Sequence, residues 1–449
     1  MTTLRSELNA LTRIAWPIAM SQLALMLMGL VEMSILGHDS VTELGGASVG
    51  RSIGHASSAI AMGVASALDP IASQAVGAGE HSRARQAFRV TMKACAILWV
   101  PLSIFAYAST WLLRPLGIDP VLIPIARSFL IGQMPSLLFF TFFICAKTFL
   151  QAHGRMQPLV WSTFIGNISN WVLCSLFVGG DAVLVRWGLP ALGLPKMGAF
   201  GAGLAGSAST LVVWLITFFA AQRSGPEGEA SAETKVVSLR EIFRIGMPIG
   251  FQFLAEIGVF ALIAVIAGKL GVNVASAHQI ALGLASFTFM ITLGVSSATS
   301  VRVGHAIGRR ENPRRAGLVG ISFGGAMMVI SAAVFAIFPE PLVQLFTHDK
   351  EVTRLAASLL RIAAAFQFFD GVQGVSAGAL RGAGDVRIPF FVNVGAYWLF
   401  GLPLALVLGF SCGWGAAGFW WGLTAGIVVV AVLLARRFWV LTRQQIERI

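Results

Sequence analysis

The stretch MPIGFQFLAEIGVFALIAVIAG, residues 247–268, is apolar along nearly its whole length and carries one ionisable side chain, Glu256, near its middle. About 20 apolar residues cross the hydrocarbon core of a bilayer as a helix. A carboxylate at that depth costs about 2.5–3.5 kcal/mol on insertion scales, so a proton, a cation or water must offset it. The stretch therefore predicts a spanning helix with a functional acid. The alternative is a protonated Glu256 packed against a neighbouring helix.

The rest of the chain has the same apolar character. Of 449 residues, 56% are hydrophobic and 12% are charged, and the mean hydropathy is +0.79. These values exclude a soluble globular protein and predict about a dozen spanning helices. The net charge of +12 comes from loops beside apolar runs, so membrane topology explains it better than nucleic-acid binding does.

Twelve apolar runs predict an all-α integral membrane protein with twelve transmembrane helices. The runs lie at roughly 11–36, 47–68, 90–113, 122–147, 157–179, 199–221, 242–268, 275–300, 316–338, 353–380, 388–410 and 414–435. The polar stretch between the sixth and seventh runs predicts a linker at 223–241. It separates a six-helix lobe at 1–222 from a second at 242–449. Most Lys and Arg residues fall at the termini and in the loops on their side, so both termini and the linker are expected in the cytoplasm.

The two halves repeat each other at a constant offset, which pairs Gly63 with Gly294. At that offset, GVASALDPIASQAVGAGEHSR at 63–83 matches GVSSATSVRVGHAIGRRENPR at 294–314. The same offset pairs Pro17 with Pro248. Six helices per half is an even number, so the halves are expected to be parallel lobes related by a pseudo-two-fold axis along the membrane normal. That plan is typical of transporters that work by alternating access.

Three acids lie well inside apolar runs, namely Glu32, Glu256 and Asp370. None of them matches another under the repeat, which indicates sites particular to each half. Gln367 and Gln373 lie three residues either side of Asp370 and share its helical face. The alternative for Asp370 is a structural pairing with a neighbouring helix.

Aromatic side chains surround Asp370 in the sequence. We expect Phe366, Phe368 and Phe369 to line a cavity for flat apolar cations.

The first half has a cluster of uncharged polar side chains at Asn167, Asn170 and Ser207. With Glu32 these side chains offer oxygen ligands of the kind that Na⁺ prefers. Alternatively they form hydrogen bonds between helices and have no ligand.

Other polar residues lie nearer the span ends. Asp69 precedes Pro70 and is interpreted as an interfacial cap or a gating residue. His278 is interpreted as a proton relay or an interfacial cap. Four basic residues at span ends are expected to extend their charged ends to the membrane surface, namely Arg51, Lys147, Arg361 and Arg381.

Motifs of soluble enzyme chemistry, including a phosphate-binding loop, are absent from the sequence, so an ion gradient is the expected energy source. Three hypotheses follow: an antiporter for cationic compounds, a flippase for lipid-linked saccharides, and a membrane-embedded enzyme. An anionic flippase cargo needs cations inside the spans, and these are scarce. An enzyme needs clustered acids or metal ligands on facing spans.

The chain resembles the multidrug and toxic compound extrusion (MATE) family, in its bacterial NorM-type branch. The resemblance rests on RIAWPIAMSQLALMLMGLVE at 13–32, SQAVGAG at 73–79, the run ending at Glu256, AHQIAL at 277–282 and FFDGVQGVSAGALRGAGD at 368–385. It implies a two-lobed antiporter, not an enzyme, that exports cationic amphipathic drugs in exchange for Na⁺ or H⁺ and needs no cofactor. It also implies a monomer among the lipids of the bacterial inner membrane.

The resemblance also implies roles for particular residues. Glu256 and Asp370 match the second-lobe cation-site acids, where Na⁺ would bind, and Glu32 matches the first-lobe acid, joined by Asn170 and Ser207. The chain departs from the family pattern where Glu32 stands for the usual Asp. It departs again where Gly166 stands for a polar partner and where Phe366 stands for a frequent Tyr.

Overall fold

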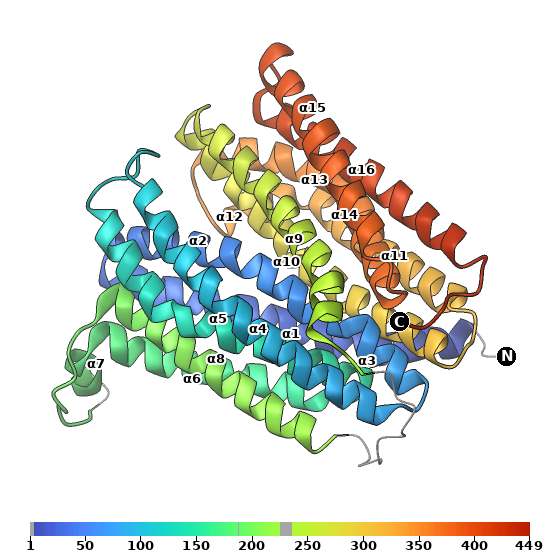
Figure 1. Cartoon of the computed structure of the whole chain (residues 1–449). Coiled ribbons are helices and arrows are strands. Elements are labelled where there is room, and N and C mark those ends of the chain that lie inside the picture. The colour runs from blue at the N-terminus through green and yellow to red at the C-terminus, as the bar shows by residue number, and fades with distance from the viewer. Residues whose placement is uncertain (1–3, 187, 225–235) are drawn as a thin grey trace. The chain divides into compact units, whose positions relative to one another are not determined.

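The computed structural model describes residues 4–186, 188–224 and 236–449. Within these ranges every regular element is a helix (Figure 1). The main helices are α1 (Leu4–Asp39), α2 (Val41–Ser66), α3 (Leu68–Gly77), α4 (His81–Ser109), α5 (Leu122–Ala152), α6 (Gln157–Gly179), α7 (Asp181–Arg186), α8 (Gly198–Gln222), α9 (Leu239–Gly268), α10 (Val272–Gly308), α11 (Arg314–Ile337), α12 (Pro339–Gln344), α13 (Lys350–Gly382), α14 (Arg387–Val394), α15 (Leu402–Leu406) and α16 (Gly415–Leu441). Twelve helical segments of the described ranges are long and apolar enough to span a membrane. The predicted all-α, twelve-helix fold is confirmed.

The chain forms two compact units. The N-unit comprises residues 21–68 and 81–250, and the C-unit comprises residues 1–20, 69–80 and 251–449. These bounds differ from the predicted lobes, because the first part of α1 and nearly all of α3 belong with the C-terminal helices, and residues 242–250 of α9 belong with the N-terminal helices. Most of the predicted linker, 225–235, lies outside the described residues.

The internal repeat is visible in helix lengths. The spans Val41–Gly77 and Val272–Gly308 occupy matching positions of the repeat, and each contains 37 residues. The first is interrupted at Ala67, between α2 and α3, whereas the second is continuous as α10. Pro70 explains the interruption, because its ring clashes with the carbonyl four residues earlier and it has no N–H to donate. The matching position in α10 is Val301.

The two copies also end alike. Gly79 and Arg310, which match under the repeat, both have left-handed backbone, with φ of 80° and 58°. In both copies the N–H of the next residue donates to the carbonyl five residues earlier, at 2.8 Å. This is the hydrogen bond of a Schellman helix end.

A close helix crossing occurs once in each unit at matching positions. In the N-unit, Gly63 of α2 lies against the backbone of Gly250 of α9, and a Cβ there would overlap it. In the C-unit, Gly294 of α10 lies against α1, where a Cβ would be 2.8 Å from the Ala15 carbonyl oxygen. Each half therefore packs its second helix on the first helix of the other half, through small residues that let backbones approach.

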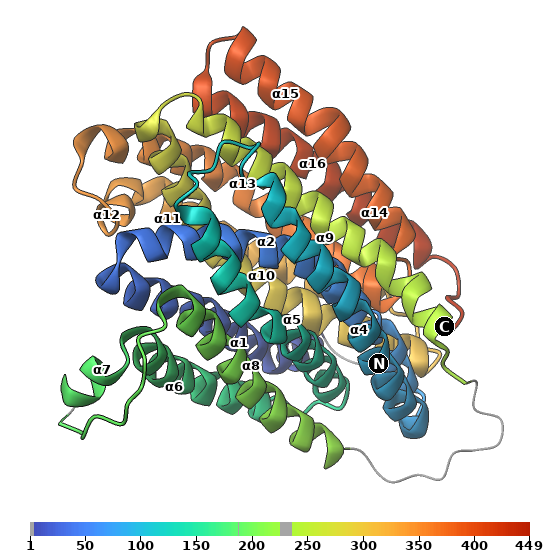
Figure 2. The same cartoon turned by 60° about the vertical axis from the view of Figure 1, so that its left-hand side comes forward.

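Each unit is packed on one long helix. In the N-unit, α5 packs against α2 and α8; in the C-unit, α13 packs against α10, α11 and α16 (Figure 2). Under the repeat, α5 and α13 correspond to each other. The helix that carries Asp370 is thus held on several sides, which fixes the position of its polar face.

Candidate ion and substrate site

The two acids of the second half lie together in the C-unit. Glu256 is on α9 and Asp370 is on α13, and the two carboxyl groups interact electrostatically. Asp370 is only 5% exposed and Glu256 is partly buried. Gln373, one helical turn after Asp370, hydrogen-bonds Glu256. Two helices distant in sequence thus bring two acids and an amide to one place.

A tyrosine completes this group, and the sequence analysis did not single it out. The π-helical stretch Gly395–Gly401 follows α14 and carries Tyr397, which is fully buried and interacts electrostatically with both acids. The next residue, Trp398, anchors the stretch by donating its Nε1–H to the Ala255 carbonyl at 3.0 Å. Single π-helical turns are frequent at functional sites. The sequence alone offered little to single it out, since both tyrosines of the chain, Tyr107 and Tyr397, fall inside predicted apolar runs.

Several side-chain oxygens of this group are buried without a hydrogen-bond partner among the described residues. They are Oη of Tyr397, Oε1 of Gln373 and Oε1 of Gln367. The Gln367 amide nitrogen is used, since it donates to Thr288 Oγ1 at 2.5 Å. Carboxylate, amide and hydroxyl oxygens are the ligands that hard cations prefer. The arrangement is therefore suited to holding a proton or Na⁺.

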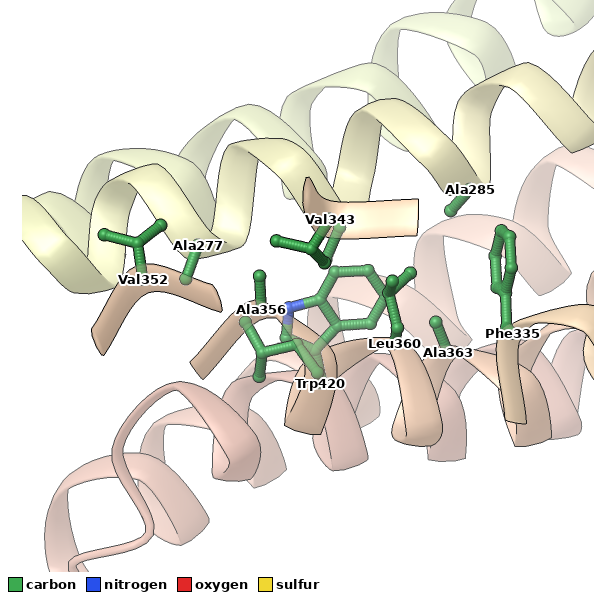
Figure 3. Close-up of a cluster of buried hydrophobic side chains, with 11 residues drawn as sticks. Ala277, Ala285, Phe335, Val343, Val352, Ala356, Leu360, Ala363 and Trp420 are labelled. Atoms are coloured by element: carbon green, nitrogen blue, oxygen red, sulfur yellow. The ribbon is translucent and has the colours of Figure 1, made fainter. Parts of the chain in front are cut away.

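An aromatic cluster adjoins the acids. Phe260 of α9 makes edge-on contacts with Phe366 and Tyr397, with 6.2 Å between ring centroids in both pairs. Phe366 also contacts Trp420 of α16 at 6.0 Å. Figure 3 shows the Trp420 ring among apolar side chains of its neighbours, including Val343, Ala356 and Leu360. Of the predicted aromatics, Phe366 joins this cluster, whereas Phe368 is 40% exposed and packs on Phe369.

His278 extends the aromatic cluster. Its Nδ1 accepts the Trp420 indole N–H at 3.1 Å. Because an indole can only donate, the neutral ring carries its proton on Nε2. That Nε2 is buried and has no partner among the described residues. His278 is 1% exposed, so it is a packed residue rather than a surface one.

Asp69, at the start of α3, pairs with a cation of the C-unit. Its Oδ2 lies 3.3 Å from Nη1 of Arg381 on α13, and both side chains are largely buried. The expectation that Arg381 extends to the membrane surface is wrong, because the guanidinium is held by Asp69 and lies over the ring of Phe253.

Glu32 lies in the N-unit, where its partner is Arg51. Glu32 Oε1 of α1 and Nη2 of Arg51 on α2 are 3.1 Å apart, with side-chain exposures of 8% and 14%. The expectation that Arg51 extends to the membrane surface is also wrong. The guanidinium of Arg51 is instead held inside the N-unit by a buried acid.

The other polar residues of the first half make their hydrogen bonds elsewhere. Asn167 donates to the carbonyls of Ala24 and Thr163 at 2.9 and 2.8 Å. Ser207 is inserted into the backbone of α5 beside Pro135: it accepts from the Ser136 N–H and donates to the Gly132 carbonyl.

Asn170 is buried, and its Oδ1 has no partner among the described residues. Within the described residues, Glu32 has no hydrogen bond or ion pair with Asn167, with Asn170 or with Ser207.

A family comparison matches the chain twice. The model of the MatE family matches residues 17–176 and 248–407. Both the starts and the ends of these two matches are separated by the same offset as the internal repeat. The chain belongs to the MatE family. The predicted family is confirmed, and the twofold match shows that each half is one copy of the family unit.

Curated MatE-family relatives align along nearly the whole chain. A probable multidrug resistance protein NorM of Pseudomonas putida is 33% identical over 444 residues, covering 96% of this chain and 94% of that protein. A protein of the same name from Rhodopseudomonas palustris is 33% identical over 453 residues, covering 98% and 93%. The NorM-type branch is therefore confirmed as well.

Solved MATE transporters share the fold. A point mutant of the Vibrio cholerae MATE transporter VcmN superposes with a TM-score of 0.86, at 18% identity, over 99% of this chain and 98% of that one. The eukaryotic MATE transporter AtDTX14 gives a TM-score of 0.84, at 23% identity, over 98% of both chains. This MatE-family chain is a multi-pass membrane protein with the MATE fold.

Proposed function

We propose that this chain is a multidrug efflux transporter that exports small cationic, amphipathic compounds in exchange for Na⁺ or H⁺. The observation that carries the proposal is the group in the C-unit: two acids, Glu256 and Asp370, held in apolar helices beside oxygens of Gln373 and Tyr397 that have no hydrogen-bond partner in the described part of the chain. The names of the curated relatives, probable multidrug resistance proteins, support export of drugs.

The mechanism follows from competition for the two acids. Two buried carboxylates near each other are unfavourable when both are charged and uncompensated, so they bind a proton, Na⁺ or a cationic substrate. The aromatic cluster of Phe260, Phe366 and Trp420 supplies apolar and cation–π contacts to a flat cation. An ion that binds one conformation better than another shifts the population between them, and the substrate leaves when the ion takes its place.

The setting of the transporter is part of the proposal. The bias of Lys and Arg toward the terminal side supports cytoplasmic termini in a bacterial inner membrane. We further propose that the chain works as a monomer surrounded by lipid, with Asp69 and His278 as gating positions.

A flippase for anionic lipid-linked saccharides is not favoured. Such a cargo needs uncompensated cations inside the membrane, whereas buried Arg51 and Arg381 each pair with an acid. The relatives and solved structures reported above are named as resistance proteins and transporters, and none of those names is that of an enzyme.

The test is efflux of a fluorescent cation from cells that carry the wild-type chain or its variants. Glu256→Gln and Asp370→Asn keep side-chain volume and remove the charge, so each is expected to abolish efflux at unchanged expression. Glu340→Gln serves as a matched control, because Glu340 is an exposed acid on α12, outside the candidate spans, and pairs with Arg361. Efflux that persists unchanged in both site variants would sink the proposal.

A further inference from the structure

The acid of the N-unit has a cation built into the chain. Glu32 on α1 forms its ion pair with Arg51 on α2, and both side chains are largely buried. The contact is one of charge, because Glu32 Oε1 and Arg51 Nη2 form no hydrogen bond within the described residues. Removing one partner of a buried ion pair leaves an uncompensated charge, so each group needs the other as long as neither finds a substitute.

The surroundings of Arg51 hold its guanidinium in place. Nη1 donates to the Gly29 carbonyl on α1 at 3.5 Å, and the guanidinium lies 5.5 Å from the ring centre of Phe129 on α5. A Cβ added to Gly29 would approach Nη1 to 3.3 Å. Gly29 on α1 and Phe129 on α5 thus surround the Arg51 guanidinium, and Glu32 is the charged residue that pairs with it.

The helices packed around this pair bring no other charged side chain of the described residues into contact with Glu32. Cys174 on α6 is the further titratable group that interacts electrostatically with Glu32, and His55 interacts with Arg51. From α8, the residue that faces the carboxylate is Gly206, where a Cβ would lie 3.8 Å from Oε2. Asn167 and Ser207 are used by backbone groups instead.

The C-unit site differs from the Glu32–Arg51 pair because it holds two acids and, among the described residues, no arginine that forms an ion pair with either of them. There two acids, Glu256 and Asp370, share one place, and the cation that acts on Glu256, Arg381, is already paired with Asp69. A pair of acids needs an exchangeable cation or proton, whereas an acid beside a guanidinium is already neutralised.

We propose that Arg51 is a tethered counter-ion that takes the cation position at Glu32, so that the N-unit binds no exchangeable Na⁺ or proton there. Arg51 is then a specificity-determining residue: the acids of the C-unit carry the coupling ion alone. This inference rests on the proposed function in one respect, namely that the coupling ion is Na⁺ or H⁺.

A first experiment tests the chain with Arg51 in place. The purified double variant Glu256→Gln/Asp370→Asn is compared with the same protein that also carries Glu32→Gln. Two readouts are used: binding of radioactive Na⁺, and the infrared carbonyl stretch of a protonated carboxyl group as the pH is varied. The two proteins are expected to be identical in both. Na⁺ binding or a titrating carboxyl that disappears with Glu32→Gln would overturn the proposal.

A second experiment removes the tethered cation. Arg51→Met in the double-variant background is expected to uncover Glu32, so that one additional carboxyl titrates or one additional Na⁺ binds per chain. That gain should vanish when Glu32→Gln is added. Arg51→Lys, which keeps the charge, should show no gain, whereas a merely structural role would make Lys and Met alike. A folded Arg51→Met protein without the gain would overturn the proposal.

Controls keep these outcomes separate from other failures. Arg361→Met removes the arginine of an exposed ion pair and is expected to leave both readouts unchanged. If Arg51→Met does not fold, the first comparison still decides, because it leaves Arg51 intact. Neither experiment uses a substrate, so a failure of the proposed transport function would appear in the efflux assay and not here.

Discussion

At the scale of single residues, Tyr397 is the clearest addition to the family-derived site. Its hydroxyl is buried beside two acids and has no partner among the described residues. We predict that Tyr397→Phe lowers the apparent affinity for the coupling ion or substrate about 10- to 100-fold, because a hydrogen bond to a charged group is worth about 1.5–3 kcal/mol. Concentration-dependent transport in proteoliposomes measures the change.

The second tyrosine is a matched control for this prediction. Tyr107 lies on α4 in the N-unit, where it packs edge-on against Trp111. Tyr107→Phe is expected to leave the affinity unchanged. Equal effects of the two substitutions would contradict the role given to Tyr397.

Ser207 illustrates how one hydroxyl can stabilise a helix irregularity. Because it bridges the Ser136 N–H and the Gly132 carbonyl of α5, Ser207→Ala leaves backbone groups unpaired next to Pro135. We predict a loss of about 1–3 kcal/mol in the free energy of unfolding. Thermal denaturation in detergent measures it, with Ser209→Ala as control, since Ser209 bonds only within its own helix. A smaller loss for Ser207 than for Ser209 would refute this account.

At the scale of helices, the two glycine crossings limit side-chain size. A Cβ on Gly63 would overlap the α9 backbone, whereas one on Gly294 would meet α1 at 2.8 Å and one on Gly283 would meet nothing within 4 Å. We predict that stability falls most in Gly63→Ala, by about 1–3 kcal/mol, and less in Gly294→Ala. Gly283→Ala should be neutral or stabilising by up to about 1 kcal/mol.

Melting temperatures of the three purified variants test this order. A Gly63→Ala protein that melts together with Gly283→Ala would show that α2 and α9 do not meet at this glycine.

At the scale of the whole molecule, the identity of the coupling ion determines which ion gradient drives transport. An Na⁺ gradient and a pH gradient are imposed on proteoliposomes in separate experiments. We predict that one of the two gradients drives transport of a cationic drug and that the other has no effect. Glu256→Gln should abolish the response to the effective gradient. Transport that proceeds at the same rate without any gradient would contradict ion-coupled antiport.

Several features were readable from the amino-acid sequence because they depend on local chemistry. Twelve spans follow from apolar length, and the two halves follow from a constant offset that the family matches reproduce. Glu256 and Asp370 stood out because an acid in an apolar helix has a high cost wherever the helix packs.

Other features depend on which helices become neighbours, and residue order does not state that. Tyr397 reaches the two acids through a π-helical turn, and Ser207 faces the α5 backbone rather than Glu32. In the sequence, Arg51 lies near the start of an apolar run and is interpreted as a span-end residue. Its ion-pair partner, Glu32, lies on another helix, so the pairing could not be read from residue order. The sequence by itself determined the fold class, the repeat and the costly acids. Only the tertiary structure decided which cation, amide or hydroxyl compensates each acid, because those partners come from helices far apart in the chain.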